Sequence, residues 1–488
     1  MNLPPAPQNR IRTVADLPVQ SDGRYVLYWM TAFRRCRSNF ALQHACHTAH
    51  TLKKPLLVFE ALRCDYPWAS ARTHHFILEG MRDNAATLSE KRIAYYPYVE
   101  PAPNAGKGLL AALAENACVV IGDDSPAFFL PQALAAASRK LHTRLEVVDS
   151  NGLLPLRTAT KDYPSAYAFR RLLQKQLPEF LDRFPLDEPP GDLPPSPLEI
   201  SHDILERWPP CSPEQLARTR DWLHKLPLDH AISPTPTSGG SNAARRQLQA
   251  FIDKVLVDYA ENRNQLHEHA TSGLSPYLHF GHIGSHEIFT AIARAENWHP
   301  GKTGPDSRGR REGWWGMRRG AEAFLDQLVT WRELGYNYST FRDDAPRFDS
   351  LPDWAQATLE NHADDPRPHR YTPEQFDAAS THDPLWNAAQ TQLRRDGSIY
   401  GYLRMLWGKK ILEWSTSPQE ALQTMIELNN RYALDGRDPN SYSGILWCLG
   451  RYDRPWPERA IFGKVRSMSS INTARKIDVK SYLERFTP

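Results

Sequence analysis

The first 150 residues alternate between short apolar runs and longer stretches with helical periodicity. Continuous apolar runs separated by helices are typical of a parallel sheet covered by helices on both faces. The pattern therefore predicts a doubly wound α/β domain over residues 1–180. The apolar, β-rich runs cover residues 25–30, 55–62, 93–99, 118–122 and 145–148, and helical periods fill 39–52, 72–92 and 131–141.

Proline-dense sequence follows this region. The segments EPPGDLPPSP and RWPPCSP lie within residues 184–213, and SPTPTSGGSN covers 233–242. Both are typical of connectors, because proline removes backbone donors and Gly and Ser add conformational freedom. Beyond residue 242 strand signals nearly vanish and helical periods dominate. We therefore predict a linker over 181–242 and an all-α C-terminal domain over 243–488.

Composition excludes some classes of protein and leaves others open. The 488 residues have a mean hydropathy of −0.57, and no apolar run approaches the roughly 20 residues needed to span a bilayer. The first residues lack the apolar core of a secretory signal, so we expect a cytoplasmic protein, associated with the nucleoid if it binds DNA. With a formal charge of only +3, any nucleic-acid site must come from locally clustered basic residues.

Several common site motifs are missing from the sequence. The Rossmann-like arrangement of the N-terminal domain carries no G-x-G-x-x-G after its first strand, and Gly106-Lys107 lacks the other residues of a P-loop. The six cysteines form no C-x-x-C pair, and His44, His47 and His50 have no acidic or Cys partner nearby in sequence. We therefore expect reduced structural thiols and no metal site.

Tryptophan is unusually frequent in the C-terminal half. Trp407 and Trp414 are seven residues apart, which is two helical turns, or roughly 10 Å of rise, on nearly one face. Trp386 lies in the preceding helical segment. Large aromatics at this spacing can simply form a core. Alternatively, they form a series of oxidisable rings that carries electrons to a buried redox cofactor.

Two polar segments are candidates for ligand binding. The turn that follows Asn429 contains Asp435, whose carboxylate would need a cation such as Arg404 if it were buried. This turn is either an ordinary loop or a set of carboxylate and amide groups directed at a polar ring. The hydroxyl-rich stretch 271–281 precedes a helix, and it either binds a diphosphate or simply caps that helix.

Basic residues cluster twice in the C-terminal half. The stretch 307–319 interleaves five arginines with Trp314 and Trp315, and a second cluster contains Lys464 and Arg466. Guanidinium groups between aromatics suit backbone phosphates and unstacked bases. A solvated, charged loop explains the first cluster equally well.

Together these segments resemble the class II cyclobutane pyrimidine dimer (CPD) photolyases of the photolyase/cryptochrome superfamily. The resemblance covers nearly the whole chain, and its motifs are specific in combination. They are SGLSPYLHFG at 272–281, QLVTWREL at 327–334, DPLWNAAQ at 383–390, GYLRMLWGKKILEW at 401–414 and RYALDGRDPNSYSGILW at 431–447.

The resemblance implies that the helical domain binds FAD non-covalently in a bent form. It places Arg404 and Asp435 beside the isoalloxazine ring and Asn429 opposite flavin N5. Electron transfer would involve Trp407, then Trp386, with Trp414 outermost. The implied contacts to the phosphate and ribityl groups are Tyr259, Thr271, Ser272, Gly273, Leu274 and Ser275, and the implied contacts to the dimer and the DNA are Trp331, Trp447, Lys464 and Arg466.

The implied function is light-driven repair of pyrimidine dimers in double-stranded DNA, by electron transfer from photoexcited reduced FAD. The resemblance also implies a monomer and an antenna pigment of the deazaflavin type. One position departs from the family, because Gln327 stands where a catalytic Glu usually binds the dimer. Gln donates and accepts hydrogen bonds but supplies neither a proton nor a negative charge. Two alternatives therefore stay open: a cryptochrome-like flavin photoreceptor with weak or no repair, and a flavin-free DNA-binding protein.

Overall fold

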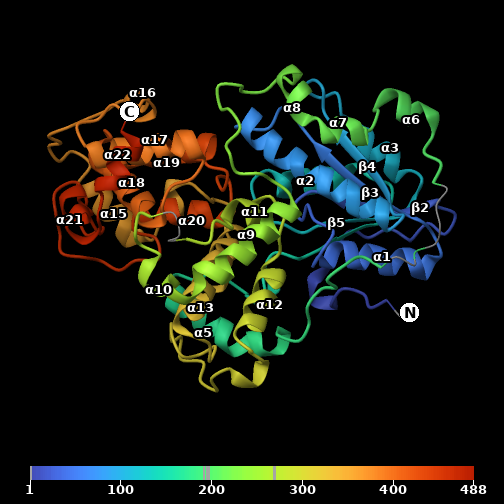
Figure 1. The fold of residues 1–488 in the computed structure, drawn as a ribbon, viewed down its shortest axis with the longest axis horizontal. Coiled ribbons are helices and arrows are strands. Elements are labelled where there is room, and N and C mark those ends of the chain that lie inside the picture. Colours follow the sequence, from blue (N-terminus) through green and yellow to red (C-terminus); the bar gives the residue numbers. More distant parts are fainter. Residues whose placement is uncertain (1–2, 191–192, 194–197, 268–270, 488) are drawn as a thin grey trace. The chain divides into compact units, whose positions relative to one another are not determined.

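A computed structural model describes residues 3–190, 193, 198–267 and 271–487 of the chain (Figure 1). The chain forms two compact units, each built from segments that are not contiguous in sequence. Unit 1 comprises residues 1–159, 177–248 and 274–294, and unit 2 comprises residues 160–176, 249–273 and 295–488.

Unit 1 contains a six-stranded sheet with the strand order β1-β6-β5-β2-β3-β4. Strands β2 to β6 pair in parallel, as the apolar runs predict, with Val26 opposite both Leu56 and Val119. The edge strand β1 is antiparallel to β6 and half-exposed, which explains why no apolar run marks it. The strands are β1 Ile11–Ala15, β2 Tyr25–Met30, β3 Leu56–Leu62, β4 Ala94–Val99, β5 Ala117–Asp123 and β6 Leu145–Val148.

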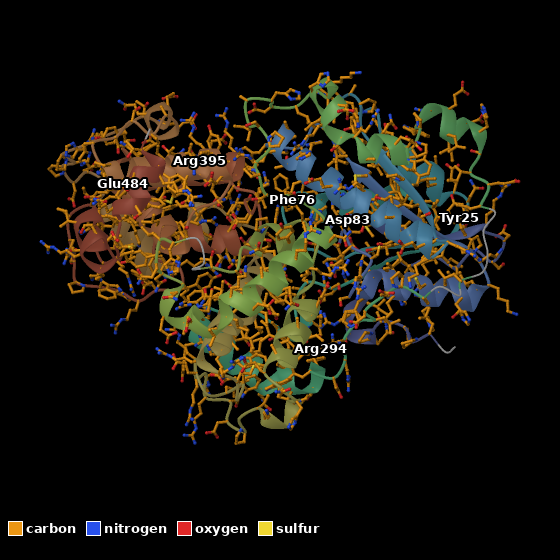
Figure 2. All side chains as sticks on the ribbon, in the orientation of Figure 1. Tyr25, Phe76, Asp83, Arg294, Arg395 and Glu484 are labelled. Carbon is orange, nitrogen blue, oxygen red and sulfur yellow. The ribbon has the colours of Figure 1, made fainter. Side chains whose placement is uncertain are left out.

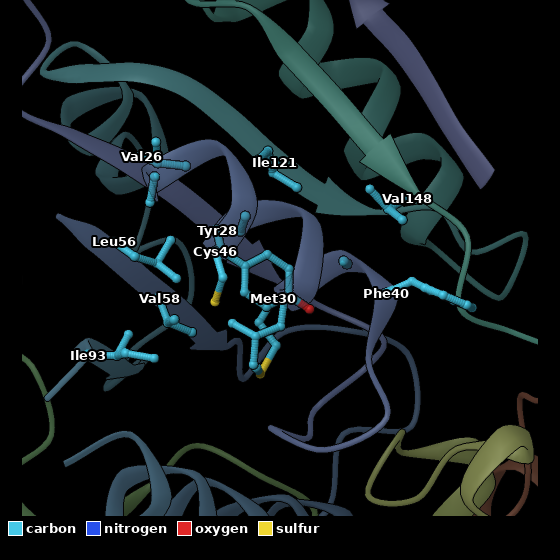
Figure 3. Packing of buried hydrophobic residues seen from close by; sticks show 14 of the residues in the cluster. Val26, Tyr28, Met30, Phe40, Cys46, Leu56, Val58, Ile93, Ile121 and Val148 are labelled. Carbon is cyan, nitrogen blue, oxygen red and sulfur yellow. The ribbon is translucent and has the colours of Figure 1, made fainter. Parts of the chain in front are cut away.

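Helices cover both faces of this sheet, so the predicted α/β class is confirmed. On one face, Val26 and Tyr28 pack with residues of α1, including Phe40 (Figure 3). On the other face, Tyr25 and Leu27 pack with residues of α3 and α6. The described helices of this unit are α1 Phe40–Leu52, α2 Ala71–Glu90, α3 Leu109–Ala114, α4 Leu130–Lys140, α6 His202–Arg207, α7 Pro213–Ala217, α8 Thr219–Trp222, the N-terminal part of α9 Ser241–Lys254, α11 Ser275–His279 and most of α12 Ser285–Ala295.

The last part of the proline-rich segment is fastened along α2. The backbone N–H of Gly239 donates to Glu79 at 2.6 Å, and that of Asn242 donates to Asp83 at 2.8 Å. Phe76 and Asp83 both lie on α2 (Figure 2). A Cβ at Gly239 would lie 2.0 Å from the Phe76 carbonyl oxygen, so only glycine allows this approach. These contacts fix the segment to unit 1.

Unit 2 is helical, which also agrees with the sequence pattern. Its described helices are α5 Ala166–Gln176, the C-terminal part of α9 Ser241–Lys254, α10 Tyr259–Asn262, α13 Arg319–Leu325, α14 Arg332–Phe341, α15 Asp353–Asn361, α16 Pro373–Asp377, α17 Pro384–Asp396, α18 Gly401–Trp414, α19 Pro418–Tyr432, α20 Pro439–Cys448, α21 Ser470–Lys476 and α22 Lys480–Phe486. A π-helical turn, Asp326–Trp331, joins α13 to α14. Among the described residues, no helix has the length and apolar character needed to cross a membrane.

A buried carboxylate organises the loop that follows β2. Asp123, at the end of β5, accepts hydrogen bonds from the backbone N–H groups of Thr31, Ala32 and Phe33 at 2.7 to 2.9 Å. Tyr28 donates to its other oxygen at 2.8 Å. Burial raises the pKa of Asp123 despite these donors. One side chain therefore satisfies the backbone of a whole turn at the carboxyl edge of the sheet.

We expect Asp123→Ala to destabilise the protein by on the order of 3 kcal/mol, because it leaves several buried N–H groups without an acceptor. Thermal and urea unfolding of the full chain would measure this loss. The exposed Asp22 provides the control, since Asp22→Ala should change stability by less than about 0.5 kcal/mol. Equal effects of the two substitutions would contradict the role of Asp123 as the acceptor that stabilises this turn.

Candidate functional site

The three predicted tryptophans form a contact series between α17 and α18. The indole N–H of Trp386 donates to the Trp407 carbonyl at 3.0 Å. The rings of Trp386 and Trp414 lie 5.9 Å apart at 69°. Each of the three side chains is 2% exposed or less. The structure therefore brings the three residues together: Trp386 meets the Trp407 backbone through its N–H and the Trp414 ring directly.

The two ends of this tryptophan series have different surroundings. The indole N–H of Trp407 donates to the fully buried Gln390 at 2.9 Å, which fixes the inner ring. At the outer end, Trp414 contacts the half-buried Tyr371 at 5.5 Å. The Tyr371 hydroxyl in turn lies 2.6 Å from Nδ1 of the exposed His382. Sequence analysis missed Tyr371, because it lies outside any helix.

Arg404 and Asp435 form the predicted ion pair. Arg404 Nη2 lies 2.9 Å from Asp435 Oδ1, and the two side chains are 16% and 15% exposed. Arg404 reaches across from α18 to the turn that follows α19. Its Nε is buried and has no hydrogen-bond partner among the described residues. A buried donor without a partner is unfavourable, so this atom is suited to a ligand acceptor.

Asn429 is held in a fixed orientation near the end of α19. Its side-chain N–H groups donate to Ser441 at 2.9 Å and to Asn430 at 3.2 Å. Asn430 itself accepts a hydrogen bond from the Arg437 backbone at 2.8 Å. No described residue donates to Asn429 Oδ1. The amide oxygen therefore remains available to an N–H group of a ligand.

The predicted phosphate and ribityl contacts lie on separate segments. Tyr259 packs edge-on against Phe251 and Phe324 in unit 2, and burial raises its pKa to about 12. Thr271 and Ser272 are half-buried, whereas Gly273 is exposed with a φ of +65°. Leu274 and Ser275 belong to unit 1, where Ser275 begins the five-residue helix α11. Their joint role in cofactor binding stays a prediction.

The π-helical turn carries the candidate dimer contacts Gln327 and Trp331, which are both half-buried. The Trp331 ring meets Tyr452 edge-on at 6.5 Å. Asp326, next to Gln327, is buried and bound by Arg170 at 2.8 Å. Arg170 therefore holds Asp326 Oδ1, whereas the buried Oδ2 has no hydrogen-bond partner among the described residues.

Trp447, the other candidate dimer contact, is half-buried near two cations. Lys409 Nζ lies 4.8 Å from its ring, and the Arg466 guanidinium lies 5.5 Å from it. Arg466 is also paired with Asp453 through two contacts, at 2.8 and 3.0 Å. Lys464 is exposed on the same loop. The structure thus brings Trp447 and Arg466 together, and their role in binding DNA stays a prediction.

The loop that carries Lys464 and Arg466 is held by a histidine. His362 lies between two carboxylates, with Nε2 2.9 Å from Glu458 and Nδ1 2.6 Å from Asp365. Asp365 also accepts the Ile461 backbone N–H at 2.7 Å. The hydrogen bonds to Glu458 and Asp365 raise the pKa of His362. His362 thus anchors the candidate DNA-contacting loop to the end of α15.

The first basic cluster is built differently from a base-stacking surface. Trp314 and Trp315 are buried, and Glu322 accepts backbone N–H groups of this loop, including that of Gly316 at 2.9 Å. The exposed Arg318 is paired with Glu296 at 2.7 Å. The tryptophans therefore anchor the loop, which favours the simpler of the two interpretations.

Comparison with known proteins gives a consistent result. No protein-family model matches the chain. A deoxyribodipyrimidine photo-lyase from Methanothermobacter thermautotrophicus is 34% identical over 477 residues, covering 98% of this chain and 97% of that protein. One from Oryza sativa subsp. japonica is 34% identical, over 94% of this chain and 87% of its own length. One from Potorous tridactylus is 31% identical, over 99% of this chain and 85% of its own length.

Solved structures with the same fold are more distant in sequence. A bacterial class III photolyase from Agrobacterium tumefaciens aligns with a TM-score of 0.64 at 18% identity, covering 97% of this chain and 87% of that one. A cryptochrome from Synechocystis sp. PCC6803 aligns with a TM-score of 0.66 at 15% identity, covering 95% of this chain and 88% of that one. At these identities the comparison supports the fold alone.

We expect His362→Gln to lower the melting temperature in a pH-dependent way. Because the folded pKa of His362 is raised, its stabilisation is complete below the ordinary histidine pKa of about 6.5 and is lost as pH rises through the folded value. The difference between variant and wild type should therefore be largest near about pH 5.5 and should vanish in alkaline buffer. His202→Gln, at an exposed histidine of α6, is the control. A difference that does not vary with pH would contradict the anchor.

Proposed function

Because the chain belongs to the deoxyribodipyrimidine photo-lyase family of DNA-repair enzymes, we propose that it splits cyclobutane pyrimidine dimers by light-driven electron transfer. The observation that carries this proposal is the contact series of Trp407, Trp386 and Trp414. Buried indoles so close together suit the delivery of electrons to a redox cofactor. We further propose a monomer that acts on double-stranded DNA in the cytoplasm, associated with the nucleoid.

FAD fits the polar groups of unit 2. Arg404 Nε is a buried donor without a partner, and Asn429 Oδ1 is an acceptor to which no described residue donates. Arg404 and Asn429 would hold the flavin ring, with Asp435 keeping the guanidinium in place. Bound FAD would supply the photochemistry, a reversible one-electron reduction of the dimer driven by light.

Arg404 acts on the charge of the cofactor. A guanidinium beside the flavin favours an anionic form over a neutral one. Asp435 limits this effect because it neutralises part of the positive charge at 2.9 Å. We propose that Tyr259, Thr271, Ser272, Gly273, Leu274 and Ser275 bind the phosphate and ribityl groups, and that unit 1 binds an antenna pigment of the deazaflavin type.

The tryptophan series delivers electrons from the surface side of unit 2 toward the flavin. Trp407 is proposed as the ring nearest the cofactor, Trp386 as the next and Trp414 as the outermost. Contact between the Trp386 and Trp414 rings provides short steps for an electron. The series thus converts oxidised cofactor to its active form, whereas repair itself does not consume its electrons.

In the proposed function the half-buried Trp331 and Trp447 bind the lesion. A pyrimidine dimer is already partly unstacked, so extruding it costs less than extruding normal bases. Trp331 and Trp447 would receive it, while Gln327 offers its amide as donor and acceptor. Lys464 and Arg466 would bind backbone phosphates.

A repair assay tests the proposal directly. The protein is loaded with FAD, chemically reduced, mixed with an oligonucleotide that contains a thymine dimer, and exposed to blue light. Repair restores the ultraviolet absorbance of the separated bases. A parallel sample in the dark and a sample with undamaged DNA are the controls. A chain that binds no FAD, or that leaves the dimer intact under light, would refute the proposal.

Trp407→Phe should block photoreduction of oxidised, FAD-loaded protein while sparing repair by chemically reduced protein. Phenylalanine keeps a ring at the site but is much harder to oxidise, so it interrupts the innermost step. Flavin absorbance during illumination with an external reductant measures photoreduction. Trp456→Phe, which lies outside the series, is the matched control. Photoreduction at the wild-type rate in the Trp407 variant would remove this residue from the path.

Gln327 favours a second candidate, a cryptochrome-like flavin photoreceptor with weak or no repair. The amide lacks the negative charge and the proton of the usual Glu, and Asp326 is bound to Arg170. If Gln327 limits repair, Gln327→Glu should raise the yield of repaired dimers severalfold under identical illumination. Gln327→Ala should lower lesion affinity by about fivefold through loss of one hydrogen bond. A wild-type protein that photoreduces but never repairs, even as Gln327→Glu, would favour the photoreceptor.

A further inference from the structure

Lys409 is a buried cation that the proposed chemistry does not use. Its side chain on α18 is 0% exposed, and Nζ donates to the Cys448 carbonyl at 2.7 Å. Among the described residues, no carboxylate lies within ion-pair distance of it. A buried ammonium without a counter-ion is costly, and such residues are often retained for function.

The other contact of the Lys409 ammonium is the ring of Trp447, at 4.8 Å. Helix α20 can approach α18 this closely because position 408 is glycine. A Cβ at Gly408 would lie 2.6 Å from the Cys448 sulfur. Lys409 thus reaches both the end of α20 and the aromatic ring that α20 carries.

The neighbouring Lys410 provides a natural comparison. Its Nζ lies 5.2 Å from the ring of Trp414, but it is also paired with Glu413 at 2.8 Å. Two consecutive lysines therefore contact tryptophans with different proposed roles. The charge of Lys410, which lies beside Trp414, is neutralised by Glu413. The charge of Lys409, which lies beside Trp447, has no carboxylate partner among the described residues.

We propose that Lys409 is a positioning residue for lesion recognition, whose charge holds the Trp447 ring in the orientation that stacks on an extruded dimer. The inference rests on the proposed function, in which Trp447 contacts the dimer. The attraction between an ammonium and an indole is strongest when both are desolvated.

A change in the protonation of Lys409 distinguishes the proposed role of its charge from a role in packing alone. A neutral amine can still donate a hydrogen bond to the Cys448 carbonyl, but it loses the cation–π attraction to Trp447. Burial lowers the pKa of Lys409 to about 8. Its charged neighbours are Arg466 and Asp453, and the pKa of the Cys448 thiol is raised by burial to about 11. Asp453 has a lowered pKa, so Lys409 is the group of this set that titrates in mildly alkaline buffer.

The test is dark binding of a fluorescent duplex with one thymine dimer, compared with the same duplex undamaged. For wild type, the ratio of the two affinities should fall about fivefold as pH rises from about 7 to about 9.5. Lys409→Met should show the low ratio throughout, with no pH dependence in this range. Lys410→Met is the matched control and should follow wild type.

A double-mutant cycle with Trp447→Leu separates positioning from general damage to the fold. If Lys409 acts through Trp447, adding Lys409→Met to Trp447→Leu should leave the affinity ratio unchanged. A full effect of Lys409→Met in that background would overturn the inference. So would a Lys409→Met single variant with the wild-type ratio and pH profile. Wild-type protein that does not distinguish damaged from undamaged DNA at neutral pH would instead refute the proposed function.

Discussion

The hydrogen bonds of two buried indoles fix the geometry on which the functional site depends. Trp386 donates to the backbone of α18, and Trp407 donates back to Gln390 on α17. An indole N–H inside a protein needs a partner, so these bonds set both the separation of the two helices and the tilt of the rings. The contact between Trp386 and Trp414 follows from that arrangement, as does the position of Arg404 one turn before Trp407.

Charge is distributed around this aromatic path in matched pairs. Arg404 is balanced by Asp435, Lys410 by Glu413 and Arg466 by Asp453. Balanced pairs keep the interior stable while leaving polar atoms in defined positions. Lys409 stands apart, because among the described residues no carboxylate lies within ion-pair distance of it, and its ammonium contacts a carbonyl and an aromatic ring. The potential near Trp447 therefore depends on the protonation of Lys409 as well as on the paired charges of Arg466 and Asp453.

Much of this organisation follows from local sequence. Apolar runs marked the five parallel strands to within one residue at most ends, and the spacing of Trp407 and Trp414 indicated a shared helix face. Local sequence could not show β1, whose half-exposed residues lack an apolar run. It also could not identify Lys409, His362 or Tyr371, because their partners are set by tertiary contacts. Lys409 meets a carbonyl 39 positions away, and His362 meets Glu458 at a separation of 96.

The interleaved segments of the two units constrain how the chain can fold as it leaves the ribosome. Unit 1 takes its last segment from residues 274–294, so its sheet domain cannot be completed until the intervening part of unit 2 has already been synthesised. Domains generally form as units during translation, the N-terminal one first. In this protein the N-terminal unit cannot finish packing first, because helices α11 and α12, which belong to it, are synthesised only after residue 273.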